Sequence, residues 1–144
     1  MTKNKSLLAL FIALTFCLTG LNSAFAADAP IVSAVPNKKS YSVGESGTLT
    51  INFKTGKKIK IPKDPEIEVT IEDGVSGAGM QDYSGNGAGD DYLKTAHVVY
   101  NFTVPQGAHG TITIHGKVKF GYCNSEDGVC KIATKTFSAK IKID

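Results

Sequence analysis

Short stretches in which apolar and polar residues alternate recur from residue 49 to the end of the chain. In the first of them Leu49, Ile51 and Phe53 alternate with Thr50 and Asn52. A period of two places every apolar side chain of a β-strand on the same face, and the β-branched and aromatic residues that dominate these stretches favour strands. The pattern therefore predicts an all-β fold. The alternating stretches are residues 49–53, 59–61, 67–71, 96–104, 112–122 and 137–143.

The residues between these stretches favour the same fold. Glycine and proline, which end strands and form turns, separate the stretches, and no stretch of helical spacing with capping residues follows position 26. About seven short strands in a chain of this length are typical of an antiparallel sandwich. We therefore expect one domain over residues 27–144, an immunoglobulin-like antiparallel β-sandwich.

The first 26 residues have the organisation of a secretory signal peptide. Lys3 and Lys5 form a basic start, residues 7–18 are almost entirely apolar, and the small-x-small sequence AFA ends at Ala26. The apolar run is shorter than the roughly 20 residues that a membrane-spanning helix needs. We therefore predict cleavage after Ala26 and an exported, soluble, periplasmic product without a membrane span in the mature chain.

The charged residues argue against nucleic acid as a partner. All 16 basic residues are lysine, and 13 residues are acidic. Arginine, the side chain that makes forked contacts with phosphates and bases, is absent from the sequence. Without Lys3 and Lys5 the domain is nearly neutral, so it has no electrostatic attraction to a polyanion.

Few residues outside the cysteines have the pattern of a chemical site. His97, His109 and His115 are expected on polar strand faces or in a turn, without the spacing of metal ligands. The acidic pairs at 90–91 and 126–127 fall in predicted loops, and no phosphate-binding glycine loop or nucleophile elbow is present. We expect neither a metal nor a cofactor.

Residues 74–91 form the one long interruption of the strand pattern. Their sequence, GVSGAGMQDYSGNGAGDD, contains six glycines and few apolar residues. We predict a long loop, because such segments in compact domains are either flexible connectors or functional flaps. As a flap it would carry Met80 and Tyr83 over a site.

Cys123 and Cys130 remain after removal of the signal peptide. An even number of cysteines in an oxidising compartment indicates a disulfide, here closing a ring of about eight residues. The even positions 112–122 form an apolar face, so Cys123 points away from the core. In the last strand the odd positions 133–143 form the apolar face, so Cys130 and Ile132 also point outward, unless a bulge near Ala133 reverses their direction. With a turn at Gly128, we expect a hairpin that carries an accessible disulfide on the outer face.

The sequence GYCNSEDGVC at residues 121–130 resembles the N-terminal periplasmic domain family of the thiol:disulfide interchange protein DsbD. In that family a strand ending in an aromatic residue leads into a cysteine, acidic residues, Gly-x-Cys and a final strand. The chain differs in two respects. Six residues separate its cysteines where the best-known members have five, and Lys131 and Ile132 follow Cys130 where a proline is frequent.

The resemblance implies an immunoglobulin-like fold in which Cys123 and Cys130 are the catalytic redox pair. It implies thioredoxin-like periplasmic proteins and a membrane electron donor as partners, no cofactor, and a cap loop for which residues 74–91 are the candidate. Two interpretations stay open. The chain is either a thiol–disulfide carrier of the oxidoreductase type or a non-enzymatic binding module with a structural hairpin disulfide. For the carrier we expect attack at Cys130, because its neighbours Gly128 and Val129 leave that end of the loop less crowded with charge.

Overall fold

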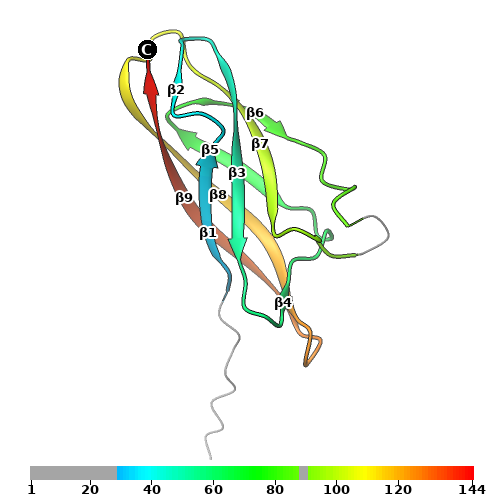
Figure 1. Cartoon of the computed structure of the whole chain (residues 1–144). Helices are drawn as coiled ribbons and strands as arrows, with labels where there is room; N and C mark the ends of the chain where they lie inside the picture. The colour runs from blue at the N-terminus through cyan, green and yellow to red at the C-terminus, as the bar shows by residue number, and fades with distance from the viewer. Residues whose placement is uncertain (1–28, 88–90) are drawn as a thin grey trace, which may run out of the picture.

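The computed structural model describes residues 29–87 and 91–144, and Figure 1 shows their arrangement. The predicted signal peptide, with Cys17 and the cleavage site at Ala26, lies outside the described residues. The described part contains nine β-strands and no helix. It therefore has no helix that is long and apolar enough to cross a membrane.

The first sheet has four strands in the order β1-β3-β7-β6. Each neighbouring pair in this sheet is antiparallel. The strands are β1 (Ile31–Pro36), β3 (Ser46–Lys54), β7 (His97–Thr103) and β6 (Ser76–Met80).

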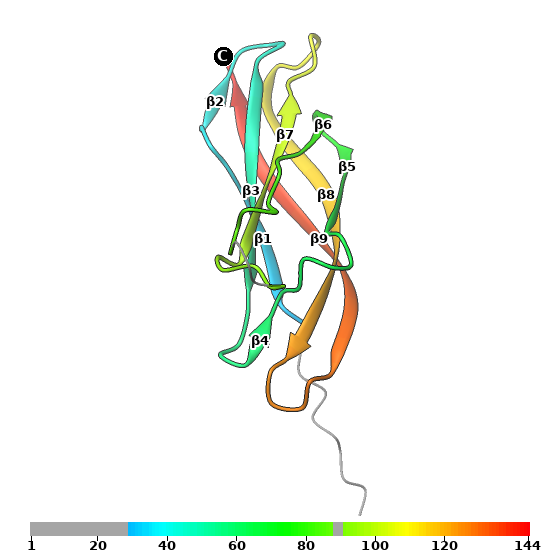
Figure 2. The ribbon, with the colours of Figure 1, turned by 90° about the vertical axis from the view of Figure 1, so that its right-hand side faces the viewer.

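The second sheet has five strands, in the order β2-β9-β8-β4 with β5 also paired to β8. Strand β2 runs parallel to β9, and the other pairs are antiparallel. The strands are β2 (Ser40–Tyr41), β9 (Cys130–Ile143), β8 (Gly110–Asn124), β4 (Ile59–Lys60) and β5 (Glu68–Asp73). Two views at right angles show the tip of the β8–β9 hairpin near β4, at the end of the molecule opposite the C-terminus (Figure 1, Figure 2).

The two strand orders are those of an immunoglobulin domain. In such a domain one sheet has the order ABED and the other contains C, F and G. Strands β1, β3, β7 and β6 occupy the positions A, B, E and D, while β4 with β5, then β8 and β9, occupy C, F and G. The prediction of an immunoglobulin-like antiparallel sandwich is confirmed. Strand C is divided because Pro62 and Pro65, which have no backbone N–H, interrupt it.

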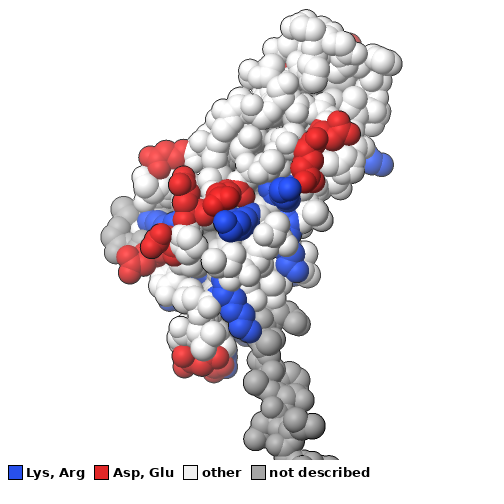
Figure 3. All heavy atoms as spheres, turned by 180° about the vertical axis from the view of Figure 1, so that it is seen from behind, with Lys and Arg blue, Asp and Glu red and all other residues white. Residues whose placement is uncertain are grey.

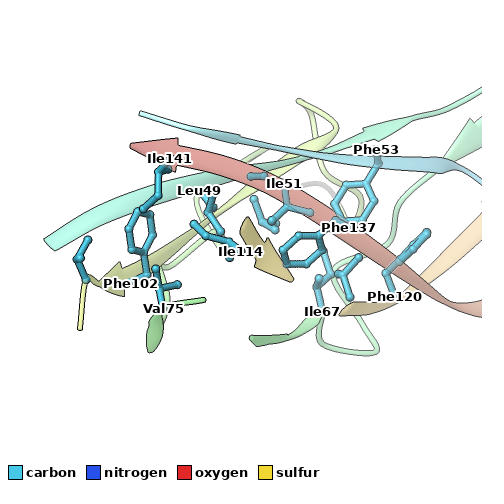
Figure 4. Close-up of a cluster of buried hydrophobic side chains, with 14 of the residues drawn as sticks. Leu49, Ile51, Phe53, Ile67, Val75, Phe102, Ile114, Phe120, Phe137 and Ile141 are labelled. Atoms are coloured by element: carbon cyan, nitrogen blue, oxygen red, sulfur yellow. The ribbon is translucent and has the colours of Figure 1, made fainter. Parts of the chain in front are cut away.

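The hydrophobic core lies between the two sheets and is built from the alternating residues. Leu49, Ile51 and Phe53 of β3 are at most 3% exposed, and Ile114, Val118 and Phe120 of β8 face them with no exposure at all. Phe53 and Phe120 contact each other across the sandwich, with ring centroids 4.7 Å apart. Figure 4 shows side chains of both sheets meeting in this core. The alternation of the sequence therefore identified the core-facing residues of β3 and β8, one strand from each sheet.

The prediction that residues 74–91 form one loop is wrong for its first half. Residues 76–80 form the edge strand β6, paired with β7. Backbone pairing needs no apolar side chains, and the glycines suit the position: a Cβ at Gly77 would lie 2.4 Å from the Tyr100 hydroxyl oxygen. Gly79 has a φ of +93° beside a register shift in the pairing. The apolar pattern could not reveal a strand made of such residues.

Candidate functional site

The β8–β9 hairpin carries both cysteines at its tip. Fourteen directly opposed pairs run without a register shift from Gly110 and Ile143 to Cys123 and Cys130. The last pair is joined by a disulfide, with the two Cα atoms 4.0 Å apart. The predicted disulfide is confirmed, and the bulge near Ala133 that would have reversed the direction of Cys130 is absent from the pairing.

The hairpin loop is closed by hydrogen bonds of its own. The backbone N–H of Asn124 donates to the Val129 carbonyl oxygen at 2.9 Å, and that of Gly128 donates to the Asn124 carbonyl oxygen at 3.0 Å. The Asp127 carboxylate accepts the Val129 N–H at 2.9 Å, and Gly128 has a φ of +70°. These contacts hold the turn, as its Asp-Gly sequence predicted, and none of them involves a cysteine.

Loop residues also connect the hairpin to β4. The backbone N–H of Ser125 donates to the Lys58 carbonyl oxygen at 2.8 Å, and the Lys58 ammonium forms an ion pair with Glu126. The tip of the hairpin is therefore fixed against the neighbouring strand.

Both cysteines lie on the outer face of the second sheet, as the alternation of even and odd positions in the two strands predicted. Ile132, also predicted to face outward, is 62% exposed. The two cysteines differ in accessibility, however. Cys130 is exposed, whereas Cys123 is only 4% exposed. The expectation of an accessible disulfide therefore holds for Cys130 and is wrong for Cys123.

The connection between β4 and β5 explains why Cys123 is buried. Cys123 is opposed by Cys130 on β9 and by Lys60 on β4, which makes a row across three strands. On the same face Pro62 packs over Gly121, where a Cβ would lie 3.0 Å from the proline Cγ. The absence of a side chain at Gly121 lets this segment approach the sheet next to Cys123. The even or odd position of a residue in its strand sets the side of the sheet to which its side chain points. It does not show which distant segment covers that side.

An open groove of about 630 Å³ lies at the disulfide. Cys123, Cys130 and Ile132 line it from the hairpin, and Pro62 and Tyr92 line it from the facing segments. Its charged lining residues are Lys63, Asp64, Asp91 and Lys131. The groove gives a partner molecule room to approach the exposed Cys130.

The walls of the groove are held by contacts between residues 61–63 and 91–93. The backbone N–H of Leu93 donates to the Ile61 carbonyl oxygen, and that of Lys63 donates to the Asp91 carbonyl oxygen, both at 2.8 Å. The Lys63 ammonium donates to the carbonyl oxygens of Ser84 at 2.9 Å and Gly87 at 3.0 Å. The second half of the segment 74–91 thus reaches the edge of the site through Asp91.

Met80 and Tyr83, the residues expected on a flap, pack against the core instead. The Tyr83 hydroxyl oxygen accepts the backbone N–H of Ile67 at 2.9 Å. Burial is the main cause that raises the pKa of the Tyr83 phenol. Tyr83 therefore anchors its loop to the start of β5 and does not cover the disulfide.

Sequence reasoning missed Lys60 and Tyr92. The Lys60 ammonium lies 5.4 Å from the centroid of the Tyr92 ring, which lines the groove. No motif marks either residue in the sequence. The only available signal was the alternation of Ile59 and Ile61 around Lys60, which places the lysine on the outer face.

The histidines lie apart from this site. His109 and His115 are exposed and His97 is half-buried, and the His109 Nδ1 lies 3.2 Å from the Gly107 carbonyl oxygen. Among the residues that the structure describes, no three His, Cys, Asp or Glu side chains come together in a way that could hold a metal ion.

The outer face of the second sheet carries mixed charges. Lys117 and Lys119 of β8 form ion pairs with Glu72 at 2.9 Å and Glu68 at 3.2 Å. Figure 3, which views the molecule from behind, shows acidic and basic residues interspersed on this side. This face does not present the continuous basic surface that binds nucleic acids.

Comparisons with known proteins do not identify a family for this chain. No family model matches the chain, and no curated protein matches it. One similar solved structure is that of AggA, the major subunit of aggregative adherence fimbriae type I from Escherichia coli. The two sequences are 10% identical, the match covers 82% of this chain and 97% of AggA, and the TM-score is 0.32. A likeness at this level carries no argument about function. The comparisons give no evidence for the DsbD family, so that resemblance rests on residues 121–130 alone.

Proposed function

We propose that this chain is a periplasmic thiol–disulfide exchange protein whose redox centre is the Cys123–Cys130 disulfide. The observation that carries the proposal is the unequal exposure of the two cysteines beside an open groove. Exchange requires a thiolate to reach one sulfur while the other sulfur leaves. With Cys130 exposed and Cys123 buried, the two roles fall to different residues.

The exchange proceeds in two balanced steps. A thiolate of a partner dithiol attacks Sγ of Cys130, the Cys123–Cys130 bond breaks, and Sγ of Cys123 leaves as a thiolate that then takes up a proton. The partner's second thiolate then attacks the partner's first sulfur, which is bonded to Cys130 in the mixed disulfide, and the Cys130 thiolate is released. The partner loses two electrons, and the cysteine pair gains them. The same two steps in the reverse direction pass the electrons to an oxidised partner.

The energetics of the hairpin support a redox role. In the chain-entropy model a ring of about eight residues contributes about 2.5 kcal/mol, less than a bond across a longer loop would. The paired strands and the hydrogen bonds of the loop already fix the two cysteines opposite each other. A bond that adds little to such a hairpin can open without loss of the fold.

The resemblance supplies the proposed partners, which are thioredoxin-like periplasmic proteins and a membrane electron donor. The signal-peptide pattern and the disulfide support export to the periplasm. Intact-mass measurement of the exported protein is expected to give Ala27 as the first residue. Retention of Met1 would contradict export by cleavage.

The alternative is a non-enzymatic binding module with a structural disulfide. The burial of Cys123 favours it, because a buried sulfur resists attack. Ile132, which lines the groove and is 62% exposed, would then form part of a binding surface together with Val129 of the hairpin loop, which is 49% exposed.

Two measurements decide between these functions. Redox titration against glutathione, with thiols counted by mass spectrometry, should give a potential above the roughly −300 mV below which structural disulfides resist reduction. In the second, Cys123→Ser and Cys130→Ser are matched single-thiol variants. Cys123→Ser should form a mixed disulfide with an aromatic disulfide reagent at least about tenfold faster, because its remaining thiol is the exposed one. A bridge that is reduced only when the protein unfolds would establish the structural alternative.

A further inference from the structure

The buried sulfur of the pair has a lysine directly beside it. Lys60 on β4 is opposed to Cys123 on β8, and directly opposed residues have Cβ atoms about 5 Å apart on the same face. We propose that the Lys60 ammonium stabilises the thiolate of Cys123 and so makes Cys123 the leaving group of the exchange. This inference rests on the proposed function, because it assigns a residue to that same site.

The direction of the Lys60 side chain follows from its neighbours. Ile61 is 2% exposed and belongs to the core, so the preceding residue points to the outer face, where the cysteines lie. The ammonium lies over the Tyr92 ring, and Tyr92 lines the groove together with Cys123. Tyr92 is itself held by a β-bridge to Pro62. The cation thus lies over a side chain that lines the groove, and its own strand position is opposed to Cys123.

Cys123 needs such a cation more than Cys130 does. Burial disfavours the charged form of a thiol, and a sulfur that leaves as an unfavourable thiolate leaves slowly. Water can solvate a thiolate at the exposed Cys130. The two cysteines therefore occupy different electrostatic surroundings.

The other charges at the groove nearly cancel. Two of the four charged lining residues are basic and two are acidic, and one of the basic groups, the Lys63 ammonium, is bound by two carbonyl oxygens. In the hairpin loop the Glu126 carboxylate is paired with Lys58. Lys60 is the additional positive charge in the row of Cys123. The charged groups around the pair are Lys60 on β4, Lys63 and Asp64 after β4, Asp91 on the facing loop, Lys131 on β9, and Glu126 and Asp127 in the hairpin loop.

The test measures the pKa of each thiol by itself, from the ultraviolet absorbance of the thiolate against pH. Cys130→Ser isolates Cys123, and Cys123→Ser isolates Cys130. Adding Lys60→Met, which keeps most of the apolar stem, should raise the pKa of the Cys123 thiol by about one unit, the lower end of the effect of a nearby opposite charge. Lys60→Arg should keep the wild-type pKa, and the pKa of Cys130 should move much less.

Lys117→Met is the matched control. It removes a lysine from the same face of the same sheet, six residues along β8 from Cys123. That separation is about 20 Å, at which dissolved salt largely screens the interaction between two exposed charges. Its effect on the pKa of Cys123 should be negligible. Circular dichroism spectra identical to that of the wild type verify that each variant is folded. An unchanged Cys123 pKa in Lys60→Met, or an equal shift in Lys117→Met, would overturn the inference.

The inference and the proposed function can fail separately. A raised Cys123 pKa in Lys60→Met, in a protein whose disulfide does not exchange with dithiols, would refute the function and support the electrostatic role of Lys60. Rapid exchange in the wild type with an unchanged pKa in Lys60→Met would refute only the role of Lys60. If both hold, exchange of the Lys60→Met protein with dithiothreitol should be slowed by about three- to tenfold, because a less stable thiolate leaves more slowly.

Discussion

Reduction of the Cys123–Cys130 bond should leave the sandwich folded. The bond closes a ring of about eight residues, for which the chain-entropy model gives about 2.5 kcal/mol. A domain of this size is usually stable by about 5–15 kcal/mol. The hairpin keeps its fourteen opposed pairs and its loop hydrogen bonds when the bond opens. We therefore expect the reduced protein to be native at room temperature and its Tm to fall by roughly 10 °C.

Thermal unfolding followed by circular dichroism, with and without a phosphine reductant, measures this difference. The double variant Cys123→Ala, Cys130→Ala is the control, because it should melt near the reduced protein and be insensitive to reductant. Loss of the β-sheet signal on reduction at room temperature would refute the reasoning. It would show that the bond holds the fold together and that the hairpin contacts cannot replace it.

Three further predictions concern packing, pH and partner contact. Gly116→Ala should lower the free energy of unfolding by about 2–3 kcal/mol in a denaturant titration, because its Cβ would lie 2.4 Å from the Phe137 Cζ and 2.8 Å from the Thr70 carbonyl oxygen. Gly107→Ala, with nothing within 4 Å of its Cβ, is the matched control. Burial raises the pKa of the Tyr41 and Tyr83 phenols above 10.0, so these groups ionise at lower pH in the unfolded chain than in the folded protein. The free energy of unfolding at neutral pH should therefore decline as the pH rises through the folded pKa values. A denaturant titration in alkaline buffer measures this, and a constant midpoint would contradict it. Ile132→Lys should slow exchange with a thioredoxin-like protein by about tenfold and leave exchange with glutathione nearly unchanged, because only the larger partner covers this exposed side chain; equal slowing of both reactions would exclude Ile132 as a contact.

The sequence by itself determined the fold class and the place of the disulfide. Alternation with a period of two is a local property of the chain, so it identified the buried faces of β3, β7, β8 and β9 before their partners were known. The Asp-Gly turn is equally local. Because both cysteines lie in strands with clear parity, the sequence also placed them on the outer face of one hairpin.

Only the tertiary structure decided which sulfur is exposed and what surrounds the other. Cys123 is buried because Pro62 packs over Gly121 and because β4 pairs with the end of β8, and these contacts join segments about sixty residues apart. The same pairing brings Lys60 beside Cys123, and the loop after β6 brings Tyr92 under the Lys60 ammonium. Glycine-rich β6 was also hidden from the sequence pattern, because its pairing depends on the backbone and on Tyr100 of the neighbouring strand. Periodicity records the direction of a side chain from its own strand, whereas burial and electrostatic surroundings arise from residues that only the folded chain brings together.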